Sequence, residues 1–144
     1  MGQLRGYGSG FGEGAGILVL EKRSHARRRQ AQILAGMGEV RTIGRLSPGA
    51  KGEGVDRLLP GTNTADLVGL SGTAPLDEAL LDRLPGVPRL DTGRLLGRSL
   101  AMGGLAMAAL VLALKPGGNA LHLAASPEGP YYAIDLYGGD PVRP

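Results

Sequence analysis

Gly10–Glu21, with the sequence GFGEGAGILVLE, joins a glycine-rich loop to a short apolar run. Glycine-rich loops bind phosphate when they lead into a helix, because the amides at the helix N-terminus face the anion. Here the glycines come before Ile17–Glu21, a continuous apolar run that predicts a strand covered on both faces. No register of these alternating glycines gives G-x-G-x-x-G followed by a helix, and no Gly-Lys-Ser/Thr follows. We therefore do not interpret the loop as a nucleotide site.

The composition fits one domain with an aliphatic core. The chain has 144 residues, of which 42% are hydrophobic and only 3% aromatic. It contains no cysteine, which excludes disulfides, thiolate catalysis and cysteine metal sites within this chain. The two histidines, His25 and His122, are far apart in the sequence, so we expect neither a metal site nor a cofactor.

Much of the net charge of +3 lies in one basic cluster, which consists of Lys22, Arg23, Arg27, Arg28 and Arg29. A solvated helix face is the simplest explanation of this cluster. Nucleic-acid binding by this cluster is the alternative, but no aromatic residue interleaves the cluster for base stacking, so we expect no nucleic-acid partner. The longest uncharged apolar stretch, Ser99–Leu114, is shorter than a bilayer span and predicts a buried core helix. With no signal peptide visible, we expect a soluble, cytoplasmic chain and no membrane partner.

The remaining pattern alternates strands and helices, which predicts an α/β fold with a mixed sheet and helices on its faces. Three glycines of the last predicted helix, Gly97, Gly103 and Gly104, each cost about 1 kcal/mol against alanine, so we expect a neighbouring backbone close to them. The expected elements are a helix over 24–30, a strand over 31–38, an irregular polar connection over 39–64, a strand over 65–70, a helix over 76–84, a short strand within 85–91, a helix over 92–115, and two final strands over 119–125 and 131–137 joined as a hairpin.

Three segments, in order along the chain, resemble motifs of the β-ketoacyl synthase family, which has the thiolase-like fold. Phe11–Glu21 and the following Ser24–Arg29 are similar to G-E-G-A-G-x-L-V-L-E and H-A-x-x-R. Asp66–Asp77 resembles the strand and loop H-G-T-x-T-x-x-N-D, and Thr92–Gly104 resembles T-K-S-x-x-G-H-x-x-G-A-A-G. The resemblance covers most of the chain but only the C-terminal half of a ketosynthase. It implies one thiolase-like half as a single domain over residues 1–144.

The same resemblance implies a loop whose residues have structural roles. Gly12, Glu13, Gly14 and Gly16 match the family's G-E-G-A-G segment. We interpret Glu13 as a hydrogen-bond acceptor inside that loop rather than as a chemical group.

The family's reaction is a decarboxylating condensation of acyl chains carried by an acyl carrier protein. The resemblance implies a cysteine nucleophile, two histidines and a lysine. In this sequence the first histidine position is Ser71, the lysine position is Gly93 and the second histidine position is Arg98. Arg98 could donate hydrogen bonds to an oxyanion, but it stays protonated and cannot act as a base. Ser71, Thr73 and Arg98 would mark the floor of the former acyl site.

These replacements leave several functions open. The first is a noncatalytic subunit, similar to a chain length factor, that packs against an active ketosynthase in fatty-acid or polyketide biosynthesis. The second is an active acyltransferase part whose cysteine-bearing half is a separate chain. The third is a remnant or a small stand-alone binding module. We expect the chain to be inactive alone, a pseudoenzyme, and to form a homo-oligomer or a heterodimer with a ketosynthase, with an acyl carrier protein as a further partner.

Overall fold

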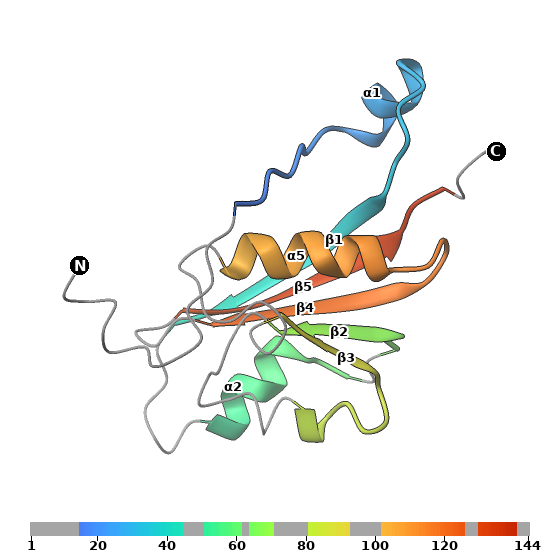
Figure 1. Cartoon of the computed structure of the whole chain (residues 1–144). Helices are drawn as coiled ribbons and strands as arrows, with labels where there is room; N and C mark the ends of the chain where they lie inside the picture. Colours follow the sequence, from blue (N-terminus) through green and yellow to red (C-terminus); the bar gives the residue numbers. More distant parts are fainter. Residues whose placement is uncertain are drawn as a thin grey trace.

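A mixed five-stranded sheet is the centre of the protein (Figure 1). The computed structural model describes residues 15–44, 51–61, 64–70, 81–92, 102–125 and 130–140. Within them the order of the strands across the sheet is β1-β5-β4-β2-β3. The elements are α1 (Arg23–Arg28), β1 (Ala35–Ile43), α2 (Lys51–Leu58), β2 (Leu67–Leu70), β3 (Arg89–Asp91), α5 (Met102–Ala113), β4 (Asn119–Ala125) and β5 (Tyr131–Gly138).

The strands pair in both directions, as the sequence predicted for a mixed sheet. β2 is parallel to both β3 and β4, and β5 is antiparallel to both β4 and β1. The predicted hairpin of the last two strands is confirmed, with Asn119 opposite Tyr137 and Ala125 opposite Tyr131. β1 contains an irregularity between Met37 and Val40, where the pairing register with β5 shifts.

Successive residues of β4 point to opposite faces of the sheet and define two apolar layers. Leu121 and Leu123 pack with Leu58 of α2 in one buried cluster. Ala120 packs on the other side with Leu110 of α5. Figure 1 shows α5 and α2 on opposite sides of the sheet. The core is aliphatic, as the composition indicated.

Gly69 is the glycine whose missing side chain makes room for α5. A Cβ built on Gly69 would lie 2.7 Å from Cδ2 and 3.3 Å from Cβ of Leu110. Gly103 and Gly104 differ from the expectation, because a Cβ on either would meet nothing within 4 Å. Within the described part of the chain, nothing therefore requires glycine at those two positions. Gly97 lies outside the described residues.

Two predicted strands and the long connection need correction. Ile17–Glu21 is not a strand: it is extended, exposed and outside the sheet. The strand expected over 31–38 is β1, which begins later and runs to Ile43. The connection expected to be irregular over 39–64 holds the end of β1 and the whole of α2, so that expectation is wrong for those residues. Burial of Val55, Leu58 and Leu59 against the sheet is what holds α2 in place.

The other helices fall largely where the sequence placed them. α1 lies within the predicted 24–30 segment apart from its first residue, and α5 lies inside the predicted 92–115 helix. Residues 76–80 and 93–101 of the two predicted helices lie outside the described residues. Among the helices that the structure describes, none has the length and apolar character needed to cross a bilayer.

Candidate functional site

The carboxyl ends of β2, β3 and β4 lie at one edge of the sheet, because these strands are parallel. This is the edge at which α/β sheets usually bind ligands. The Oγ1 atom of Thr92 donates a hydrogen bond to the carbonyl oxygen of Leu70 at 3.0 Å, and Thr92 is almost fully buried. This bond ties the end of β2 to the end of β3 and gives that edge a fixed floor.

The resemblance assigned the residues of the former acyl site to segments that follow β2 and β3, and the residues of the structural loop to the segment before α1. Gly16 is described, and it is exposed and belongs to no helix or strand. A Cβ on Gly16 would lie 3.6 Å from the carbonyl oxygen of Gly104, which is an ordinary contact. The role of Gly16 in a structural loop therefore stays a prediction. The other candidates, Ser71, Thr73, Gly93, Arg98, Gly12, Glu13 and Gly14, lie outside the described residues.

His122 is buried in the middle of the sheet and is not placed to act as a base. His122 is 2% exposed, and among the residues that the structure describes its Nδ1 atom has no hydrogen-bond partner. Its cross-strand neighbours are Gly69 and Ile134. Burial lowers the pKa of His122 from 6.5 to about 4, so the imidazole is neutral at pH 7. His122 is therefore part of the core of the described residues.

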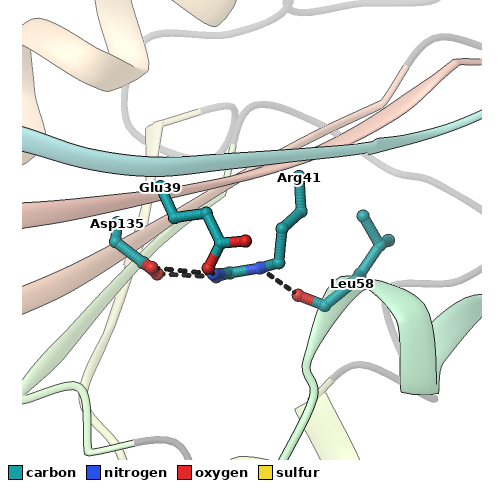
Figure 2. Close-up of polar contacts among 4 residues, drawn as sticks. All are labelled: Glu39, Arg41, Leu58 and Asp135. Carbon is teal, nitrogen blue, oxygen red and sulfur yellow. Dashed lines mark hydrogen bonds and ion pairs between the residues drawn. The ribbon is translucent and has the colours of Figure 1, made fainter.

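Arg41 on β1 holds a polar network that the sequence analysis did not identify (Figure 2). Its Nη1 and Nη2 atoms donate to the two carboxylate oxygens of Asp135 on β5, at 2.7 and 2.6 Å. Its Nη1 atom also donates to Glu39 at 2.9 Å, and its Nε atom donates to the carbonyl oxygen of Leu58 at 2.7 Å. The hydrogen bonds from Arg41 to Asp135 raise the pKa of the guanidinium. The network thus ties β1, β5 and the end of α2 together.

A small hollow of about 190 Å³ lies beside this network, next to the start of β4. Its lining includes Arg41, Asp135, Asn119 and Tyr137. The hollow is smaller than the roughly 300 Å³ that small-molecule pockets usually have. Its arginine and aspartate already satisfy one another. We therefore interpret the Arg41 network as a structural clamp.

Replacing Arg41 by methionine is expected to lower the free energy of unfolding by about 2 kcal/mol, because the part-buried Asp135 carboxylate loses its partner. Urea unfolding measures this loss. The matched control is Arg57→Met, since the Arg57–Glu53 pair has side chains that are 68% and 65% exposed and contributes little. Equal losses in the two variants would contradict the clamp.

The segment before α1 is anchored at its end although it stands away from the sheet. We call Ala15–Glu21 the arm. The carboxylate of Glu21 accepts hydrogen bonds from Nε of Arg29 at 3.1 and 3.2 Å and lies 2.6 Å from Nδ1 of His25. The hydrogen bond from Arg29 is the largest cause that lowers the pKa of Glu21, and the contact with His25 lowers this pKa further. Figure 1 shows that the arm and α1 stand clear of the sheet.

Comparisons with known proteins identify the architecture. No family model and no curated protein matches the sequence. Several chains of solved structures match the fold, among them the following two. AntDE:AntF, a type II PKS acyl-carrier protein in complex with its ketosynthase bound to the hexaketide, matches with a TM-score of 0.63 and 14% identity over 82% of this chain. The described part of this chain has a ketosynthase-like fold. The ishigamide ketosynthase/chain length factor matches with a TM-score of 0.54 and 16% identity over 78% of this chain.

The matches agree with the family that the sequence motifs indicated and confirm the α/β thiolase-like half. The chain spans 37% of each of those two matched chains, as one half of the fold would. At 14% and 16% identity the likeness is one of fold. Activity and partners are therefore taken up as proposals.

Proposed function

We propose that the protein is a noncatalytic, ketosynthase-like subunit that acts by binding an active β-ketoacyl-ACP synthase during polyketide or fatty-acid chain elongation. The fold is that of ketosynthases and chain length factors. The sequence contains no cysteine, and the family's two histidine positions are Ser71 and Arg98. This combination keeps the architecture without the nucleophile and the bases of the reaction.

The two histidines of the chain also have other structural roles. His122 is buried within the sheet. His25 contacts the carboxylate of Glu21 at the end of the arm. Neither lies at the carboxyl edge formed by the ends of β2 and β3. This supports a role in binding rather than in proton transfer.

The observation that carries the proposal is the arm. Ile17, Leu18, Val19 and Leu20 are 90%, 42%, 79% and 73% exposed. Successive side chains of an extended segment point to opposite sides, so the arm is apolar on both sides. Covering one such side chain is worth roughly 1.5 to 3 kcal/mol. Its exposure on this chain therefore favours a partner that covers both sides.

The backbone of the arm is free to pair as well. Among the described residues no hydrogen bond involves the backbone of residues 15–20. An extended segment with free amides and carbonyls can add to the sheet of another protein. The Glu21–Arg29 contacts fix the base of the arm, which reduces the entropy lost when it binds. We place the ketosynthase contact here.

The test is light scattering of the chain mixed with a type II ketosynthase and its acyl carrier protein. A complex that contains both the chain and the ketosynthase, and is heavier than the ketosynthase with its acyl carrier protein, is expected, and Val19→Glu in the arm is expected to abolish it. Leu112→Glu, a similar change on the exposed side of α5, serves as the matched control and is expected to leave the complex intact. A chain that never associates with the ketosynthase would overturn the proposal.

The same mixture separates this function from the active alternative. A condensation assay with acyl and malonyl carrier proteins is run on the complex and on the ketosynthase alone. We expect the chain to add no condensing activity of its own when the ketosynthase cysteine is replaced by alanine. Activity that survives this replacement and requires the chain would instead support an acyltransferase part.

A further inference from the structure

The face of the sheet that carries α5 is only partly covered. α5 packs on β2, β3 and β4, with Leu110 and Leu114 buried beneath it. On β1 of the same face, Met37 and Val40 lie opposite Leu136 and Ile134, two residues of the α5 cluster. Met37 and Val40 are nevertheless 52% and 48% exposed. The part of this face along β1 is therefore an uncovered apolar strip.

The start of β5 extends this strip. Tyr132 lies two residues before Ile134 and so points to the same face. It is 38% exposed and pairs with Thr42 of β1, which is also exposed. We call Met37, Val40, Thr42 and Tyr132 the β1 strip.

The distance from the β1 strip to the strands beneath α5 leaves room for one further helix beside α5. β1 lies two strand positions from β4, which corresponds to about 10 Å at the usual strand spacing. Two packed helices lie about 8 to 10 Å apart. A helix seated on the β1 strip would therefore run beside α5 and contact both the strip and the flank of α5.

α5 is itself a suitable occupant for such a place. Its sequence, MGGLAMAALVLA, contains no charged residue, and a helix that is apolar on all sides is normally buried on all sides. Leu112 is nevertheless 78% exposed. Gly103 and Gly104 have open space where a side chain would be, which permits the close approach of another helix. Apart from Gly16, which lies beside Gly104 in the first turn, the outer side of α5 therefore lacks a covering element among the described residues.

We propose that a second copy of this chain covers this face, with the α5 helix of each copy seated on the β1 strip of the other. One surface then contains both the helix that is inserted and the strip that receives it. Such a surface is self-complementary and closes as a twofold dimer. Since α5 has no charge, the two helices meet without repulsion between like charges.

The other exposed elements do not offer this match. α1 is basic along its length, with Arg23, Arg27 and Arg28, so two copies of it would repel each other. α2 exposes an ion pair between Arg57 and Glu53. Gly16, at the start of the arm, lies beside Gly104 of α5, but the exposed residues Ile17–Leu20 take no part in the dimer, so the dimer does not depend on the proposed function.

The experiment is light scattering of the chain alone over a dilution series, without a ketosynthase. We expect a mass of twice 14.8 kDa that falls to 14.8 kDa on dilution. Leu112→Glu and Val40→Glu are each expected to shift this equilibrium at least tenfold toward the monomer, because each introduces a charge into the interface. Circular dichroism confirms that both exposed-site variants keep the fold.

The matched control is Val19→Glu, which places the same charge on an exposed aliphatic residue of the arm. It is expected to dimerise like the unaltered chain. A monomer at every concentration overturns the proposal, as does a dimer that survives both interface variants. Loss of the dimer in Leu112→Glu with full retention in Val40→Glu also overturns it, because the partner would then not be seated on β1.

Discussion

Replacing Leu110 by alanine is expected to lower the free energy of unfolding by about 3 kcal/mol, or roughly 10 °C in Tm. Leu110 is fully buried and sits against Gly69, where the missing side chain leaves space for it. Alanine would leave a cavity between α5 and the centre of the sheet. Thermal and urea unfolding at low protein concentration measure the loss.

Leu112→Ala is the matched control for this change, since Leu112 lies on the same helix but is 78% exposed. At concentrations where the chain is monomeric it is expected to cost less than about 0.5 kcal/mol. The contact with Gly69 is tested by a double-mutant cycle. Gly69→Ala is expected to be more favourable in the Leu110→Ala background, because the added methyl group then has room. Losses of equal size at 110 and 112 would contradict the packing of α5.

The last two strands were predictable because their signals are local. NALHLAA and YYAIDLY are short, rich in strand-forming residues and separated by a Pro/Gly turn. Both form strands with the expected ends, give or take one residue. Nothing about these strands depended on distant parts of the chain.

α2 was missed because its local propensity is poor. KGEGVDRL contains two glycines, which favour a loop. The helix is held by tertiary packing of Val55, Leu58 and Leu59 against the sheet. The spacing of these three residues, at i, i+3 and i+4, was the available signal. β1 was displaced for a related reason, because its irregularity between Met37 and Val40 disrupts the alternation that marks a strand.

The arm was misread because an apolar run shows that a segment needs cover but not where the cover comes from. The sequence indicated burial on both faces, and in this chain the arm remains exposed. The Arg41–Asp135 clamp could not be foreseen either, since its partners are 94 residues apart. By contrast, the motifs that follow β2 and β3 indicated the right fold, because family motifs carry information that propensities lack.

Acidification from pH 6.5 to pH 5 is expected to destabilise the protein by about 1.5 kcal/mol through His122 alone. Burial lowers the pKa of His122 to about 4 in the folded state, against about 6.5 for an unfolded chain. Between these values the unfolded chain binds a proton that the folded chain does not. The free energy of unfolding therefore falls as the pH falls through this window. Above pH 6.5 the contribution of His122 to the pH dependence fades, because the histidine of the unfolded chain also loses its proton.

The variant His122→Leu is expected to remove this slope, because leucine fills a similar volume on the apolar α5 face without a group that titrates. At pH 7 it is expected to be at least as stable as the unaltered chain, since it also eliminates the Nδ1 atom that has no hydrogen-bond partner. His25→Gln is the control for the other histidine and should leave most of the slope. Urea unfolding at intervals between pH 5 and pH 7 measures all three proteins. An unchanged slope in His122→Leu would show that the pH dependence arises elsewhere, and that His122 is not held neutral by burial.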